Sequence, residues 1–226
     1  MIDLCAYLCA RSYPGRGILL GVLPDGTPAQ AYFIMGRSEN SRNRVFEATA
    51  DGIRTRAFDE SKMTDPSLVI YHPVRPAGET LIVTNGDQTD TIRDFLLAGK
   101  SFAEALRTRT FEPDPPNFTP RISGIVGADG GYALSILKAG DGDARKGRRF
   151  FYEYERPTPG TGHFLSTYEG FGTPLPSFAG EPVEAALPQK TAAELAAMLW
   201  GALDGNNRVS LWARVGAETA IINKHK

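Results

Sequence analysis

Residues 18–35 read ILLGVLPDGTPAQAYFIM, a short apolar run, a turn and a second apolar run rich in aromatic residues. The central Pro24-Asp25-Gly26 is typical of a turn, because proline fixes one backbone dihedral and glycine tolerates the left-handed one. Short apolar runs on both sides of such a turn indicate the two strands of a β-hairpin. The stretch therefore predicts a pair of antiparallel strands.

Outward from this hairpin the same pattern recurs along most of the chain. Apolar runs bounded by turn residues predict further strands at residues 44–49, 53–58, 68–71, 80–84, 121–126, 132–137, 150–154, 164–168, 208–215 and 218–222. Apolar residues at helical spacing predict helices over residues 2–11, from Thr89 or Asp90 to Ala98, after Ser101, and over residues 191–203. Strands dominate and are mostly joined as hairpins, so we expect an α+β fold with antiparallel sheets.

Composition limits the classes of protein that the chain can be. Its 226 residues, with 42% hydrophobic and 23% charged side chains, predict a single globular domain over residues 1–226 rather than a disordered, collagenous or coiled-coil chain. Twenty-five basic against 26 acidic residues give a net charge of -1, so no overall field attracts nucleic acid or a membrane. No basic leader and no run of about 20 apolar residues is found, and we expect a cytoplasmic protein.

Motifs for common cofactors are missing from the sequence. Cys5 and Cys9 are too few for a disulfide scaffold or a zinc site and are interpreted as reduced core thiols. The histidines His72, His163 and His225 are too scattered for a metal centre, and His72 is interpreted as a structural hydrogen-bonding residue. No phosphate-binding P-loop, dinucleotide fingerprint or nucleophile elbow is present. We therefore predict no metal and no cofactor.

Polar loops beside the predicted strands are the candidate functional segments, because a rigid scaffold can hold reactive groups on loops. Residues 36–44 carry three arginines with serine and asparagine between them, which favours a phosphate or carboxylate site or, alternatively, a solvated turn with surface ion pairs. Residues 85–90 precede a predicted helix and either bind an anion or simply cap that helix through Thr89 or Asp90.

Two further loops leave alternatives open. In the proline-rich residues 112–121, Glu112 and Asp114 are two nearby carboxylates, either of which could transfer a proton if burial raises its pKa; an inert connection is the alternative. Residues 170–188 are rich in glycine and proline and include three large apolar side chains, Phe171, Leu175 and Phe178. They form an interface arm, a lid, or a segment that packs back on its own domain.

Several of these motifs occur together in one known family. The segments Tyr13-Pro14-Gly15-Arg16-Gly17, Ala31 to Ser38 with Asn43-Arg44, Val83 to Asp90 and Thr119-Pro120-Arg121-Ile122 follow one another in order. In these segments the chain resembles the stand-alone, archaeal-type IMP cyclohydrolase family and its bacterial relatives over roughly residues 13–180. The resemblance implies a four-layer αββα sandwich of antiparallel sheets, like that of the Ntn hydrolases.

The resemblance also implies a reaction and a partner. The family closes 5-formamidoimidazole-4-carboxamide ribotide (FAICAR) to IMP with loss of water in purine biosynthesis, and it uses no metal or folate. The partner is thus a small purine ribonucleotide, bound by a protein that is a possible homo-oligomer. Two alternatives remain: a non-catalytic purine-nucleotide-binding module, and an Ntn-type amidohydrolase. Because Ile2 follows Met1, the latter needs processing to a new N-terminal nucleophile such as Cys5 or Cys9.

Motif matching assigns expected roles to residues of this chain. Arg44 is expected to hold the substrate, and the catalytic groups around the closing ring are expected to be Tyr71 and either Glu112 or Asp114. Arg37 and Arg121 are expected to bind the phosphate. The full predicted set of substrate- and phosphate-binding residues is Arg37, Ser38, Asn43, Asn85, Asp87, Thr119 and Arg121. Ring closure requires proton transfer and a partner for a developing oxyanion, which these residue types can supply.

Overall fold

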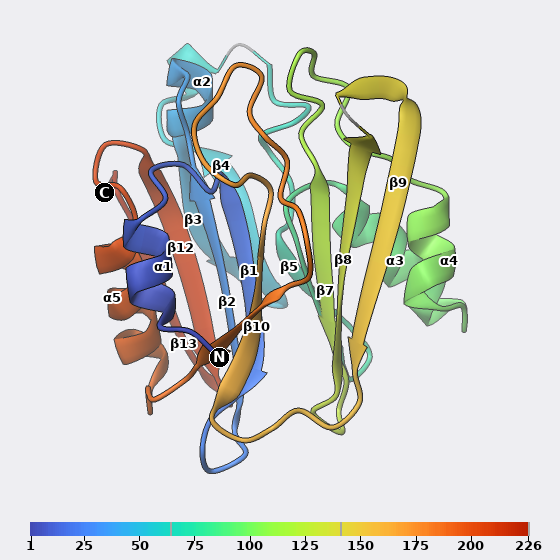
Figure 1. Ribbon diagram of the computed structural model, residues 1–226, viewed down its shortest axis with the longest axis vertical. Helices are drawn as coiled ribbons and strands as arrows, with labels where there is room; N and C mark the ends of the chain where they lie inside the picture. The colour runs from blue at the N-terminus through green and yellow to red at the C-terminus, as the bar shows by residue number, and fades with distance from the viewer. Residues whose placement is uncertain (64, 141, 226) are drawn as a thin grey trace.

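Two antiparallel β-sheets pack face to face in a computed structural model that describes residues 1–63, 65–140 and 142–225 (Figure 1). The first sheet has the strand order β11-β10-β1-β2-β12-β13. Its strands are β1 (Arg16–Val22), β2 (Pro28–Met35), β10 (Thr161–Ser166), β11 (Val183–Ala186), β12 (Arg208–Val215) and β13 (Glu218–Asn223). The predicted hairpin is confirmed as β1 and β2, which pair from Arg16 opposite Ile34 to Val22 opposite Pro28.

The second sheet follows sequence order, from β3 to β9. Its strands are β3 (Arg44–Thr49), β4 (Gly52–Ala57), β5 (Val74–Ala77), β6 (Thr80–Thr84), β7 (Arg121–Val126), β8 (Tyr132–Gly140) and β9 (Asp143–Tyr154). The helices are α1 (Leu4–Cys9), α2 (Glu39–Arg42), α3 (Gln88–Leu97), α4 (Phe102–Arg107) and α5 (Ala192–Ala202), with a 3-10 turn at Glu60–Lys62. The predicted α+β class with antiparallel sheets is confirmed.

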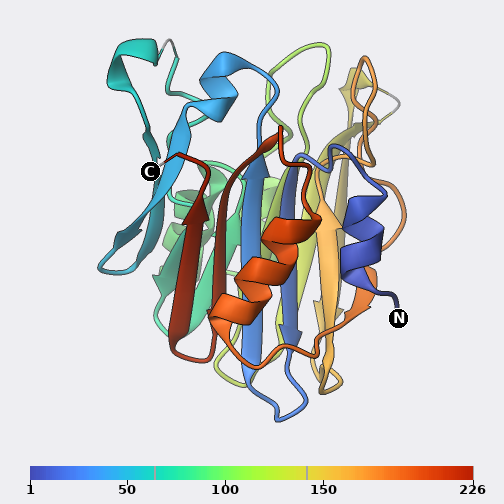
Figure 2. The same cartoon turned by 90° about the vertical axis from the view of Figure 1, so that its left-hand side faces the viewer.

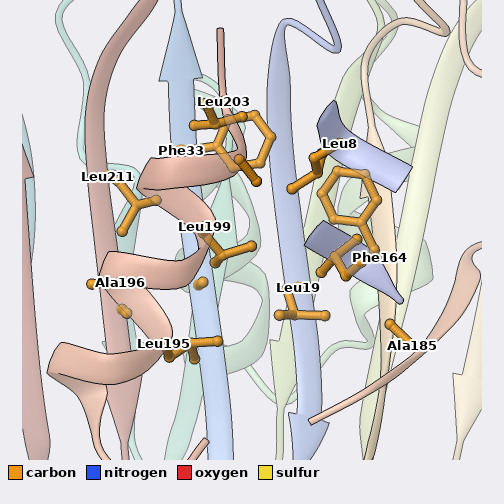
Figure 3. Close-up of a cluster of buried hydrophobic side chains, with 14 of the residues drawn as sticks. Leu8, Leu19, Phe33, Phe164, Ala185, Leu195, Ala196, Leu199, Leu203 and Leu211 are labelled. Atoms are coloured by element: carbon orange, nitrogen blue, oxygen red, sulfur yellow. The ribbon is translucent and has the colours of Figure 1, made fainter. Parts of the chain in front are cut away.

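Helices cover both outer faces, so the molecule has four layers in the order αββα (Figures 1 and 2). α1 and α5 lie on the first sheet, where Leu8 and Leu199 pack against Leu19 (Figure 3). The next residue of β1, Leu20, faces the core between the two sheets. Since both faces of β1 are buried, its sequence is continuously apolar rather than alternating. The further likeness to Ntn hydrolases stays a prediction.

The predicted N-terminal caps are present in α4 and α5 but not in α3. Ser101 and Glu104 form the predicted capping box of α4, and the Thr191 side chain accepts a hydrogen bond from Glu194 at the start of α5. The predicted capping of α3 by Thr89 or Asp90 is wrong. Thr89 donates to the carbonyl of Gly86 instead, and Asp90 pairs with Arg75.

The predicted strand at residues 68–71 is wrong, and the neighbouring strand β5 begins only at Val74. The backbone N–H of Thr55 donates to the carbonyl of Tyr71 at 2.9 Å, and the N–H of Tyr71 donates to the Thr55 hydroxyl at 2.7 Å. The same hydroxyl donates to the carbonyl of Val69. A side chain thus replaces part of the backbone ladder, and residues 69–71 lie beside β4 as an irregular segment.

Residues 170–188 pack mostly on their own domain. Leu175 and Phe178 are buried, whereas Phe171 is 56% exposed. The segment also contains β11, a strand that the sequence reading missed because glycines and prolines surround it. The prediction of two core thiols fails for Cys9, which is exposed at the end of α1. Within the described parts of the chain, no helix has the length and apolar character needed to cross a membrane.

Candidate active site

Three arginines occupy equivalent positions at one end of the sandwich, the end that carries α2 in Figure 1. Arg16, Arg44 and Arg121 are the first residues of β1, β3 and β7. Their exposed fractions are only 9%, 0% and 6%. Because the backbone ladder fixes where each strand begins, the fold places three guanidinium groups inside this end of the molecule. A buried cation is unfavourable unless an anion or a polar group compensates it.

Arg44 is the least compensated of the three. Its Nε donates to the carbonyl of Ser41 at 2.9 Å. Its two terminal nitrogens are buried and have no hydrogen-bond partner among the described residues. Burial lowers the pKa of Arg44, but guanidinium groups remain protonated in proteins. Arg44 therefore presents a fork of N–H donors with nothing in the described chain to accept them.

Arg16 lies close enough to Arg44 and to Glu112 for their charges to interact. Burial is the largest single influence on Arg16 and disfavours its charged form, yet the Glu112 carboxylate and three nearby tyrosines together outweigh burial, so the pKa of Arg16 is raised. The Nε of Arg16 is also buried without a partner among the described residues. Two neighbouring cations with free donors form a place where an oxygen-rich or anionic group would be stabilised.

Glu112 is the acid of this cluster. Its side chain is 2% exposed. Burial raises the pKa of Glu112 to about 7, although Arg16, Arg121 and Arg44 favour its ionised form. No hydrogen bond to its carboxylate is found within the part of the chain that the structure describes. A carboxyl group of this kind can both accept and return a proton near neutral pH.

Asp114, the other candidate acid, makes hydrogen bonds within its own loop. Its two oxygens accept hydrogen bonds from the backbone N–H and the hydroxyl of Thr119. The N–H of Glu112 donates to the carbonyl of Thr119 at 2.9 Å and closes the same loop. Between them Phe118 adopts a φ of 43°, a left-handed conformation, with its ring against Phe111. Asp114 thus shapes the loop that carries Glu112.

Four tyrosines surround the charged groups. Tyr71 and Tyr32 share a hydrogen bond of 2.8 Å between their hydroxyls, and Tyr168 shares one of 2.6 Å with the hydroxyl of Thr119. Burial raises the pKa of Tyr168 to about 12, so its hydroxyl stays protonated at neutral pH. Tyr13 lies near both Arg16 and Arg44. These residues give the cluster neutral hydroxyl groups beside its charges.

A cavity of about 720 Å³ lies beside this cluster. Arg54, Arg56 and His72 line it, and so does Tyr71. Its volume falls in the range of about 300–1,000 Å³ that is usual for small-molecule sites. Arg44 and Glu112 are not among the residues that line the cavity. Tyr71, which bonds Tyr32, and Asp87, which pairs with Arg121, connect the cavity to the buried cluster.

Of the predicted site residues, the structure brings together Arg44, Tyr71, Glu112, Asp114, Thr119 and Arg121. Arg37 is exposed, and its guanidinium lies 5.2 Å from the centre of the Tyr13 ring. Ser38 is exposed and caps α2, and Asn43 bonds the backbone of Asp59. These last two residues have local structural contacts instead of contacts with the cluster.

The Asn85 and Asp87 side chains support Arg121. Asn85 is fully buried, and its amide binds the backbone of Pro120 and Ile122 on the strand that Arg121 begins. Asp87 pairs with Arg121 at 2.6 Å and also with Arg109, and Gln88 accepts a further bond from Arg121 at 2.7 Å. Arg121 is therefore compensated within the protein, unlike Arg44.

The sequence reading missed Arg16, Tyr13, Tyr32 and Tyr168 as members of the cluster. The available signal for Arg16 was an arginine at the start of a continuous apolar run, a position where a charge is unfavourable. Tyr32 lies within the apolar, aromatic strand β2, so the sequence pattern indicates a core residue and not a site residue. Among the described residues no group of three or more metal-binding side chains was found, and the absence of a metal or cofactor stays a prediction.

Comparison with known proteins places this geometry in a family. Residues 13–220 match the family described as IMP cyclohydrolase-like protein. The chain belongs to this family. Members similar to it include the IMP cyclohydrolase of Methanopyrus kandleri, which is 34% identical over 69% of this chain and 75% of its own length. That of Methanococcus aeolicus is 29% identical over 70% and 74%, and that of Halobacterium salinarum is 30% identical over 56% and 63%.

Proposed function

We propose that the protein is an IMP cyclohydrolase that closes FAICAR to IMP with loss of water. The observation that carries the proposal is the fork of unpartnered, buried donors on Arg44 beside the carboxyl group of Glu112. Membership of the IMP cyclohydrolase-like family supports the same reaction. A purine ribonucleotide also suits a cavity of about 720 Å³.

The chemistry requires bond formation and two proton transfers. The carboxamide nitrogen attacks the formyl carbon, and the carbonyl oxygen of that formyl group becomes negative. This oxygen takes one proton from the carboxamide nitrogen and a second from the formamide nitrogen, and then leaves as water. Because both reacting groups belong to one molecule, holding them in a planar conformation removes much of the barrier.

The cluster supplies the groups that these steps need. Arg44 and Arg16 donate hydrogen bonds to the formyl oxygen as it becomes negative, which is where preorganised donors have their largest effect on rate. Glu112 accepts the proton of the carboxamide nitrogen and returns it to the departing oxygen. Tyr71 contacts the substrate from the cavity side. Asp114 positions the loop of Glu112 and does not transfer the proton.

The remaining predicted residues have supporting roles. Arg121 extends the positive field of the site while Asn85 and Asp87 hold it in place. Thr119 fixes the loop through Asp114, and Asn43 fixes the turn before Arg44. Arg37 and Ser38 are exposed, and we assign them contacts with the bound nucleotide. We place the activity in one domain spanning residues 1–226, in the cytoplasm, with a homo-oligomer as a possible assembly.

The N-terminal cysteines argue against amide hydrolysis as the alternative. Cys5 and Cys9 belong to α1, which packs on the outer face of the first sheet and not between the sheets. The deciding experiment incubates the pure protein with FAICAR and follows IMP by chromatography. We expect cyclisation well above the spontaneous rate. Folded protein that binds IMP without accelerating closure would instead identify a nucleotide-binding module.

A further inference from the structure

The side chain of Thr55 holds the segment that carries Tyr71. Its hydroxyl accepts the backbone N–H of Tyr71 at 2.7 Å and donates to the carbonyl of Val69 at 2.8 Å. The backbone N–H of Thr55 donates to the carbonyl of Tyr71 at 2.9 Å. Thr55 itself is fixed in β4, opposite Phe46 of β3, and is only 1% exposed. A buried hydroxyl on a paired strand thus fastens an irregular segment to the sheet.

These contacts shift the register between the segment and β4 by one residue. β4 and β5 pair at Ile53 and Val74, whose side chains both face the core between the sheets. Regular antiparallel pairing continued from this pair would set Thr55 opposite His72. Thr55 instead bonds the backbone of Tyr71. Because side chains alternate between the two faces of a sheet, a shift by one residue exchanges the side chain that points inward.

The shift decides which of two polar side chains reaches the buried cluster. Thr55 follows Ile53 by two residues and therefore lies on the same, inner face of β4. Tyr71, which lies beside Thr55, is 7% exposed, and its hydroxyl bonds Tyr32 of the first sheet. His72 is half-buried at the wall of the large cavity. In the regular register, Tyr71 would point to the outer face and His72 would take its place.

Few other contacts hold this segment. Among the described residues, the hydrogen bonds that join residues 69–72 to other strands come from Thr55 and from the hydroxyl of Tyr32. We propose that Thr55 is a positioning residue whose hydroxyl sets the register that points Tyr71, and not His72, toward the buried arginines. This inference rests on the proposed function for the reaction that Tyr71 serves.

Three variants separate the hydroxyl of Thr55 from its shape. Thr55→Val removes the hydroxyl and keeps the branched side chain, whereas Thr55→Ala removes both. We expect both variants to lower kcat for FAICAR closure by about 10- to 100-fold and to keep KM within about threefold, because a displaced group costs transition-state stabilisation more than binding. Thr55→Ser retains the hydroxyl, and its kcat should stay within about threefold of the wild type.

Thr161→Val is the matched control. Thr161 is 7% exposed, and its hydroxyl donates to the carbonyl of Thr158 at 2.7 Å. It pairs with Val22, the last residue of β1, whereas the arginine of the cluster is the first residue of that strand. This variant loses a comparable hydrogen bond far from Tyr71, and its kcat should match that of the wild type.

A double-mutant cycle shows whether Thr55 acts through Tyr71. In the Tyr71→Phe background, Thr55→Val should lower kcat by less than about twofold more, because the hydroxyl that Thr55 positions is already absent. Kinetic losses that multiply in the double variant would mean that Thr55 acts by another route, and they would overturn the inference.

Amide hydrogen exchange supplies a readout that does not require turnover. The N–H of Tyr71 should exchange at least about tenfold faster in Thr55→Val than in the wild type or in Thr161→Val. Unchanged exchange, or wild-type kcat in Thr55→Val, would contradict the role assigned to Thr55. If the wild type does not close FAICAR while the exchange of Tyr71 responds as expected, Thr55 retains its positioning role and the proposed function is wrong.

Discussion

The hydroxyl oxygens of Tyr32 and Tyr71 lie 2.8 Å apart, and this hydrogen bond joins the two sheets beside the buried arginines. Tyr32 comes from β2, whereas Tyr71 comes from the irregular segment along β4. Burial and the contact with Tyr71 raise the pKa of Tyr32 far above its usual value, so its hydroxyl stays neutral. Tyr32 therefore orients the hydroxyl of Tyr71, the residue that also lines the large cavity.

Replacing each tyrosine separately should distinguish contact with substrate from support. We expect Tyr71→Phe to lower kcat for FAICAR closure about 10²-fold, because it removes a polar group from the reacting substrate. Tyr32→Phe should lower kcat by less than tenfold, since it removes only the partner that orients Tyr71. Each change should cost about 1 kcal/mol of unfolding free energy. Steady-state kinetics and urea unfolding give both quantities. Equal kinetic losses in the two variants would contradict direct contact by Tyr71.

The pH dependence of the reaction should follow the titration of Glu112. Because Glu112 must be ionised to accept the first proton and its pKa is about 7, kcat/KM should rise with pH and level off above about pH 7. Glu112→Gln should lower kcat about 10²–10⁴-fold and abolish this rise. Steady-state rates measured between about pH 5.5 and pH 9 provide the test.

Asp114→Asn is the control for that assignment. Asp114 holds Thr119, so its loss should destabilise the fold by about 1–2 kcal/mol while kcat stays within about tenfold of the wild type. The pH profile should keep its rise toward neutral pH. If Asp114→Asn instead lost as much turnover as Glu112→Gln at unchanged stability, the proton would have to be assigned to Asp114.

Stability should show the opposite pH trend at Glu112. A pKa of about 7 in the folded state, against an ordinary value of 4.5 for a glutamate side chain, means that the folded protein binds more protons between these values. The contribution of Glu112 to stability is therefore complete below about pH 4.5 and is lost as pH rises through about 7. The loss approaches about 3 kcal/mol, since one pKa unit corresponds to about 1.4 kcal/mol. Glu112→Gln should become the more stable protein above pH 7 in denaturant unfolding, and a constant difference across pH would refute the raised pKa.

Arg44→Lys tests the fork of donors. Lysine keeps the charge but not the planar geometry, so the transition state should lose about 1.5–3 kcal/mol of stabilisation. This loss corresponds to a fall in kcat/KM of roughly 10- to 150-fold. Arg214→Lys supplies the control. Arg214 lies near the end of β12, and its Nε donates to the nearby carbonyl of Gly216. Its kinetics should match the wild type. Unchanged kinetics in Arg44→Lys would show that charge alone suffices at this position.

Local chemistry explains which parts of the fold could be predicted. The hairpin at residues 18–35 depends on a turn and two flanking apolar runs, and all of these are adjacent in the sequence. The segment at residues 68–71 was misjudged because its backbone bonds to the Thr55 side chain, 16 residues from Tyr71. β11 was missed since its pairing with β10 is a tertiary contact between residues such as His163 and Glu184. Propensity carries no information about such partners.

The candidate site could likewise be predicted from the sequence only in part. Arg44 and Glu112 were predicted because they lie in polar loops that match a family motif. Arg16 lies in β1 between two glycines, and its proximity to Glu112 exists only after folding. The proposed preference for Glu112 over Asp114 also needed coordinates, because both acids occupy one loop and differ in burial and in hydrogen-bond partners.

The strand-opening arginines belong to different sheets, Arg16 to the first and Arg44 with Arg121 to the second. A ligand held among them would brace the two halves of the sandwich against each other. Amide hydrogen exchange at the starts of β1 and β3 should then slow together when nucleotide binds, although these strands share no backbone ladder. Without nucleotide, the two sheets would depend at this end on the contacts between their own side chains alone, among them the bond between Tyr32 and Tyr71.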